Sequence, residues 1–168
     1  MTQQFTYRNL PQLFLQAREE LLRHFRPILT HYGITEQQWR ILRTISEHDQ
    51  LEPREICELC QILSPSMSGV LARMEDLGLV TRTRMDEDQR RMLVRLTAQS
   101  EKLIAEIAPL IAQQYQWIEE AYGKDLIADM YVAMDRFFSR QRPAVAQVPL
   151  GGRKKSRAPA VRKKPKPM

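Results

Sequence analysis

The spacing of apolar residues changes twice along this chain, and this change limits the folds that the chain can adopt. Up to Gly78 the apolar residues recur every three or four positions, which is the period of a helix with one buried face. From residue 79 to 97 they alternate with polar residues, with a polar turn at 86–91, as in two strands joined by a charged tip. The helical spacing then returns. The sequence therefore predicts a mainly α-helical protein with one small β-hairpin.

Long helical stripes are predicted on both sides of the hairpin. The first covers about residues 10–32, and Pro27 inside it should kink or end the helix. The second begins near residue 98, is bent at Pro109 and breaks at Gly123, after which a last helix follows.

Three shorter helices are predicted between the first stripe and the hairpin. Thr35 can cap the first of them in a capping box with Gln38. The next covers 53–61, and the third begins with Ser64 as its cap and Pro65 at its first helical position. Three short helices followed directly by a hairpin form the layout of a winged helix-turn-helix, a DNA-binding motif.

The third of these helices would be the one that enters DNA. Met67, Val70, Leu71, Met74 and Leu77 mark its inward face, whereas the outer face carries unusually small side chains. Small side chains let a helix lie deep in a major groove about 12 Å wide. The alternative is an ordinary exposed helix flank. The DNA-contact candidates on this helix are Ser64, Pro65, Ser66, Ser68, Gly69 and Arg73.

The hairpin adds positive charge to this surface. Arginine outnumbers the acidic residues between 82 and 95, and an arginine at the tip can enter a narrow minor groove, where the potential is most negative. Asp88 would shape the turn rather than contact DNA. A solvated run of charges is the alternative. The hairpin residues expected to bind DNA are Arg82, Arg84, Arg90 and Arg91.

The net charge of +6 is unevenly distributed. Residues 141–168 hold nine Lys or Arg and no acidic residue, so residues 1–140 hold 17 basic and 20 acidic side chains. The proline-rich, basic tail is expected to be disordered. It is either a solubilising extension or a cationic arm that binds nucleic acid without reading its sequence.

Several segments resemble a known family. Leu77-Gly78-Leu79-Val80, Asp88-Gln89-Arg90-Arg91 and Leu93-Val94-Arg95-Leu96-Thr97 resemble the wing signature of MarR-type transcriptional regulators, and the resemblance extends from about residue 10 to 140. Within that family the chain is most similar to regulators of homoprotocatechuate (hydroxyphenylacetate) degradation operons. That similarity is carried by Gln16-Ala17-Arg18-Glu19, Phe25-Arg26-Pro27, Thr35-Glu36-Gln37-Gln38-Trp39-Arg40 and Cys60-Gln61-Ile62-Leu63-Ser64-Pro65-Ser66. The basic tail departs from the family pattern.

The resemblance implies a homodimer that binds a palindromic operator in double-stranded DNA, commonly as a repressor. Two recognition helices would lie about 34 Å apart, one turn of DNA. The implied division is an N-terminal dimerisation helix (1–34), a winged helix-turn-helix (35–97), C-terminal dimerisation helices (98–140) and a disordered basic tail (141–168).

The resemblance also implies release from DNA by a small aromatic acid, such as hydroxyphenylacetate or homoprotocatechuate. Such a ligand needs an arginine for its carboxylate and aromatic walls for its ring. Trp39 could instead be plain core, and Arg40 an intersubunit salt bridge. The effector-binding candidates are Arg18, His24, Trp39, Arg40, Arg43 and Tyr115.

The two cysteines leave a redox alternative open. Cys57 and Cys60 have C-x-x-C spacing, but no second pair exists and no histidine lies at ligand spacing, so no zinc site is expected. Cys60 shares the inward face with Ile56 and Leu59, which favours inert packing. A thiol-sensing regulator of the same fold remains the alternative.

Other functional classes are disfavoured. The chain has no glycine-rich phosphate loop and no nucleophile-elbow serine, so neither an enzyme nor a cofactor is expected. It has no membrane-spanning apolar run, and its first residues do not resemble a secretory signal, so we expect a cytoplasmic protein. The remaining rival is a winged-helix module that binds protein, with only the tail touching nucleic acid.

Overall fold

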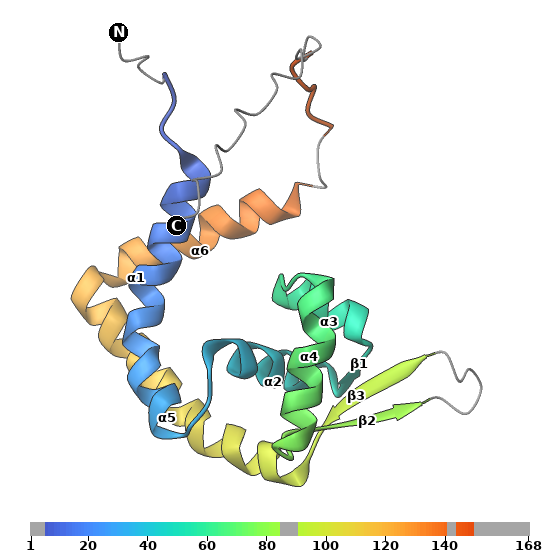
Figure 1. Ribbon diagram of the computed structural model, residues 1–168. Helices are drawn as coiled ribbons and strands as arrows, with labels where there is room; N and C mark the ends of the chain where they lie inside the picture. Colours follow the sequence, from blue (N-terminus) through green and yellow to red (C-terminus); the bar gives the residue numbers. More distant parts are fainter. Residues whose placement is uncertain (1–5, 85–90, 141–143, 150–168) are drawn as a thin grey trace, which may run out of the picture. The chain divides into compact units, whose positions relative to one another are not determined.

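The computed structural model describes residues 6–84, 91–140 and 144–149 (Figure 1). The chain forms two compact units, Met1–Ile127 and Ala128–Met168. The prediction of a mainly helical protein with a small hairpin is confirmed for the described residues. In chain order the elements are α1 (Leu10–His31), α2 (Glu36–His48), β1 (Gln50–Leu51), α3 (Pro53–Cys60), α4 (Ser64–Asp76), β2 (Val80–Arg84), β3 (Met92–Leu96), α5 (Ala98–Tyr122) and α6 (Lys124–Ser139).

Neither internal proline ends its helix. α1 continues past Pro27 to His31, and α5 continues past Pro109 to Tyr122. A proline removes one backbone hydrogen bond from the helix ladder. In α1 the residues on either side, Phe25 and Leu29, are buried, so tertiary packing holds the helix together across the missing bond.

The start of α2 follows the prediction and the start of α4 does not. The Gln38 amide donates to the Thr35 hydroxyl at 3.2 Å, and the Thr35 amide donates to the Gln38 side chain at 2.9 Å, which completes the capping box. In α4, however, Ser64 is already the first helical residue, and Leu63 is the cap, without a side-chain hydrogen bond. Leu63 has extended backbone and its carbonyl accepts from the Ser66 amide at 3.0 Å. Ser64 is therefore not the cap.

The hairpin is part of a three-stranded antiparallel sheet in the order β1-β3-β2. β3 is central, with Val94 opposite Arg82 on β2 and opposite Leu51 on β1. Sequence periodicity did not predict β1, because two residues are too few to show alternation. Figure 1 shows the hairpin extending away from α2, α3 and α4.

The core of the first unit is built from one face of each of α1, α2, α3, α4 and α5, together with the sheet. Two leucines predicted to face inward do not. Leu77 is 57% exposed because it follows the last helical residue of α4. Leu59 is 51% exposed, whereas Ile56 and Cys60 are the buried residues of α3. The most deeply buried large side chains are Ile41, Leu42, Ile45, Ile56, Met67, Leu71, Met74 and Ile107.

The start of α5 is fastened to the base of the hairpin. Ser100 is fully buried, and its hydroxyl donates to the Leu79 carbonyl at 2.7 Å. The Thr97 amide donates to the same hydroxyl oxygen at 3.0 Å, and the Ser100 amide donates back to the Thr97 hydroxyl at 3.2 Å. This buried capping box joins the wing directly to the helix that follows it.

Candidate DNA-binding and effector sites

The outer face of α4 is exposed and small, as its sequence pattern indicated. Met67, Val70, Leu71 and Met74 are buried on the opposite face. Among the described residues, a side chain built at Gly69 would meet nothing within 4 Å, so their packing does not require a glycine there. The α4 residues predicted to contact DNA are all exposed: Ser64, Pro65, Ser66, Ser68, Gly69 and Arg73.

Arg82 is engaged within the protein. Its Nε donates to Glu75 Oε2 at 2.7 Å, which joins β2 to α4. This hydrogen bond raises the pKa of Arg82 and lowers the pKa of Glu75. The Arg82 side chain is only 27% exposed. Arg82 is therefore better placed to orient the hairpin than to reach a phosphate.

The other wing residues divide into three groups. Arg84 is exposed near the end of β2. The Arg91 Nε donates to Glu52 Oε1 at 2.6 Å, which joins the hairpin to the residue that caps α3. Arg90 and the predicted turn-builder Asp88 lie outside the described residues.

A pocket of 390 Å³ lies between α1, α2 and α5. Five of the six predicted effector residues line it, although they come from three helices that are distant in sequence. Its walls are Arg18, Leu21, Leu22, Phe25, Leu29, Glu36, Trp39, Arg40, Arg43, Ile111 and Tyr115.

His24 is the exception, because it is not among the residues that line this pocket. His24 lies six positions after Arg18, so its side chain leaves the helix about 120° away from that of Arg18. Its Nε2 lies 3.5 Å from the Tyr122 hydroxyl oxygen, and that hydroxyl donates to Glu20 at 2.5 Å. The hydrogen bond to Glu20 raises the pKa of Tyr122.

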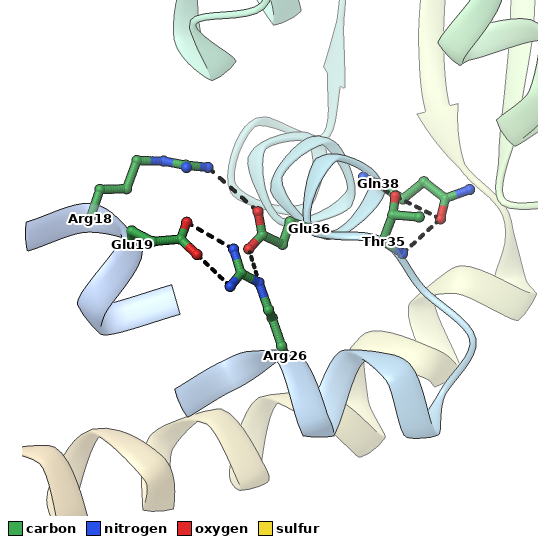
Figure 2. A network of polar contacts seen from close by, with 6 residues as sticks. All are labelled: Arg18, Glu19, Arg26, Thr35, Glu36 and Gln38. Atoms are coloured by element: carbon green, nitrogen blue, oxygen red, sulfur yellow. Dashed lines mark hydrogen bonds and ion pairs between the residues drawn. The ribbon is translucent and has the colours of Figure 1, made fainter. Parts of the chain in front are cut away.

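Two residues of the pocket wall, Arg18 and Glu36, belong to a network of ion pairs (Figure 2). Arg18 lies 3.7 Å from Glu36, and the Nε of Arg26 donates to the same carboxylate at 2.9 Å. Arg26 also binds Glu19, with Nη2 and Oε2 2.9 Å apart, and this pairing lowers the pKa of Glu19. Sequence reasoning missed Glu36 and Arg26, because α1–α2 pairing leaves no mark in the spacing of residues.

The other two arginines of the pocket differ in their contacts. The Nε of Arg43 donates to Glu47 Oε1 at 2.9 Å, and this bond is the main reason that the pKa of Arg43 is raised. The Arg40 Nε, by contrast, is buried without a hydrogen-bond partner in the part of the chain that the structure describes. A buried donor without a hydrogen-bond partner is unfavourable. A ligand acceptor that enters the pocket would therefore meet one arginine, Arg40, whose polar atoms are not all paired.

Aromatic side chains form the walls that a ring would need. Trp39 and Tyr115 are half-buried and pack against the core. The centroids of the Tyr115 and Phe25 rings lie 4.8 Å apart. Trp39 thus belongs to the core and to the pocket wall at once. The arrangement combines guanidinium groups with flat apolar surfaces, which suits an aromatic carboxylate.

Cys60 is poorly placed for redox chemistry. Cys60 is 1% exposed, and its sulfur lies 3.4 Å from the Thr44 hydroxyl. Burial raises the pKa of the Cys60 thiol, so little reactive thiolate is present at neutral pH. Among the described residues no group of three or more potential ligands could hold a metal ion, and no helix is long and apolar enough to cross a bilayer.

Residues 32–91 match the profile of the MarR family. The HTH-type transcriptional regulator FarR of Neisseria gonorrhoeae is 42% identical over 123 residues, which are 69% of this chain and 84% of FarR. The chain belongs to the MarR family. It is a MarR-family transcriptional regulator, as its wing segments indicated, and FarR too is named as a transcriptional regulator.

Two further MarR-family comparisons bear on the pocket. The homoprotocatechuate degradative operon repressor of Escherichia coli is 34% identical over 125 residues, which are 74% of this chain and 84% of the repressor. The crystal structure of NadR in complex with 4-hydroxyphenylacetate is 36% identical, with a TM-score of 0.71, and the match covers 84% of this chain and 100% of NadR. The similarity predicted from segments 16–19, 25–27, 35–40 and 60–66 is thus confirmed.

Proposed function

We propose that this regulator represses transcription by binding a palindromic operator as a homodimer, and that a small aromatic acid in the 390 Å³ pocket releases it. One observation carries the proposal. The pocket is walled by α1 and α5 on one side and by α2, the first helix of the winged helix-turn-helix, on the other. A ligand there contacts both parts and can favour one arrangement over another.

Operator binding is assigned to α4 and the hairpin. The small exposed face of α4 would enter the major groove, and Ser64, Ser66 and Ser68 could donate to base edges or phosphates. Arg73 and Arg84 are exposed and would supply positive charge to the backbone. Arg82 would hold the hairpin against α4 through Glu75.

Dimerisation is assigned to residues 1–34 and 98–140, and the winged helix-turn-helix to 35–97. Large apolar side chains are exposed in both dimerisation segments, including Leu10 and Leu15 on α1 and Trp117 on α5. Phe138 on α6 is 74% exposed. Exposed apolar surface of this kind marks protein interfaces, and a two-fold dimer would present two identical recognition helices to a palindrome.

Effector binding is assigned to the arginines and aromatic walls of the pocket. Arg18 would receive the carboxylate, with Arg40 and Arg43 adding charge, and Trp39 and Tyr115 would contact the ring. The acid can shift the equilibrium only by its difference in affinity for the DNA-binding and released arrangements. Relatives named for homoprotocatechuate degradation and for a complex with 4-hydroxyphenylacetate support this ligand class.

The test measures binding of the purified protein to DNA that flanks its own gene, by fluorescence anisotropy, with a scrambled duplex as competitor. We expect a palindromic duplex to bind more tightly than the scrambled one, and its binding to weaken when 4-hydroxyphenylacetate or homoprotocatechuate is added. Arg18→Ala should bind operator normally but respond weakly to the acid. His24→Ala, on the same helix but outside the pocket, should respond like the wild type. If the scrambled duplex competes equally well, or if none of these acids changes affinity, the proposal is wrong.

A further inference from the structure

A second cavity, of 310 Å³, lies between α2 and α5. We call it the α2–α5 cavity. It shares Trp39, Arg43 and Ile111 with the effector pocket, so the two spaces adjoin at these three side chains. The other residues that line it are Ser46, Glu47, Ile104, Ala108 and Ala112.

The chemistry of the α2–α5 cavity is amphipathic. Ile104, Ala108 and Ala112 are spaced four residues apart and form one apolar stripe on α5. Both alanines are exposed, so this part of the stripe is reached from solvent. On the α2 side the lining is polar, with the Ser46 hydroxyl and the Glu47 carboxylate. An apolar group could lie along α5 with a hydroxyl directed to α2.

The two spaces share one charged side chain, that of Arg43. Arg43 lines both, but its Nε is hydrogen-bonded to Glu47, which lines only the α2–α5 cavity. The Arg43 side chain is 55% exposed, so a rotation of its long stem would not disturb the core. A ligand carboxylate in the effector pocket could replace Glu47 as the partner of Arg43. The Arg43 side chain would then move towards the effector pocket.

The charges fix the orientation of a ligand that occupies both spaces. Glu47 would repel a carboxylate in the α2–α5 cavity, whereas Arg18 and Arg40 would attract one in the effector pocket. Glu36 opposes this attraction less than its position suggests, because Arg18 and Arg26 both pair with it. The acid end therefore belongs in the effector pocket and the apolar end in the α2–α5 cavity.

We propose that the effector is an arylalkanoic acid longer than hydroxyphenylacetate, whose apolar end extends past Trp39 and Arg43 into the α2–α5 cavity. This inference rests on the proposed function, since it names the ligand class of the same site. Each added methylene that leaves water as the apolar end moves further into the α2–α5 cavity should tighten binding about fourfold. Ala108 and Ala112 would then limit how long the chain can be.

The test is a series of acids titrated into the full-length protein, with dissociation constants measured by calorimetry. The series is 4-hydroxyphenylacetate and the matching 4-hydroxyphenyl acids with three, four and five carbons in the acid chain. We expect affinity to rise along the series in the wild type. Ala108→Leu and Ala112→Leu should each abolish the rise while leaving 4-hydroxyphenylacetate binding within about twofold. Ala105→Leu, at an exposed position of α5 outside both cavities, should keep the wild-type series.

The outcomes separate this inference from the proposed function. If 4-hydroxyphenylacetate binds but affinity is flat or falls with chain length in the wild type, the extended ligand is ruled out and the effector pocket stands. The same conclusion follows if Ala105→Leu removes the rise as fully as Ala108→Leu. If no acid of the series binds, the proposed effector function fails and this inference fails with it.

Discussion

Replacing Ser100 with alanine should destabilise the fold more than its small size suggests. The Ser100 hydroxyl is fully buried where β3 meets α5, and it connects the Leu79 carbonyl with the Thr97 amide. Alanine keeps the backbone and removes only this oxygen. The Leu79 carbonyl would then keep only its longer bond from the Thr97 amide, at 3.4 Å.

The expected size of the effect follows from these contacts. Two buried hydrogen bonds are lost, each contributing about 1 kcal/mol to stability. Alanine has a higher helix propensity than serine, which returns about 0.5 kcal/mol. The free energy of unfolding should therefore fall by about 1.5 kcal/mol.

The measurement is urea denaturation at one fixed protein concentration, because the stability of a dimer depends on concentration. Ser46→Ala is the matched control, since Ser46 is an exposed helical serine on α2 without these bonds. It should leave stability unchanged or slightly raised. If Ser100→Ala unfolds at the same urea concentration as Ser46→Ala, the buried capping box does not stabilise the junction as we infer.

Three further predictions concern charge and redox state. Arg82→Glu should weaken operator binding. Adding Glu75→Arg should restore most of that binding, because the reversed pair still joins β2 to α4. If binding does not recover and the salt slope of DNA binding falls by about 0.9, Arg82 is instead a phosphate contact. The pairing with Arg26 lowers the pKa of Glu19 in the folded state. The ion pair therefore stabilises the fold above the ordinary glutamate pKa of about 4.3, and this stabilisation is lost as the pH falls through the lowered pKa. Glu19→Gln should thus be less stable than the wild type at pH 7, and urea denaturation should show the difference shrinking below about pH 4. Peroxide should leave operator affinity unchanged in the wild type and in Cys60→Ser alike, because the Cys60 thiol is buried and its pKa is raised. If an anisotropy titration shows that peroxide weakens binding of the wild type only, that interpretation is wrong.

The sequence predicted the elements of this fold better than their connections. Helical spacing and capping residues located the helices, and alternation located the hairpin, because each depends on residues close together in the chain. The errors occurred at element ends. Leu63 rather than Ser64 caps α4, and Leu77 and Leu59 are exposed although they continue apolar patterns. At a helix end, tertiary packing decides burial, and periodicity carries no information about it.

The candidate effector site could be predicted only in part. A need for arginine and aromatic groups selected five residues that share one pocket, but it also selected His24, which points elsewhere on α1. It missed Glu36 and Glu47, the carboxylates that neutralise Arg18 and Arg43 before any ligand binds. The pair Arg43–Glu47 lies four residues apart on one helix and is visible in the sequence. The pair Arg18–Glu36 joins two helices and is not.

The two-residue strand β1 has a consequence for engineering regulators of this kind. β3 holds β1 along one edge and β2 along the other, so the segment leading into α3 and the hairpin share one central strand. A transplant of α4 or of the hairpin alone would place foreign side chains against these pairings. Moving residues 50–96 as a block would carry every backbone bond of the sheet with it. A chimaera with a new operator preference is therefore best made by exchanging that whole block.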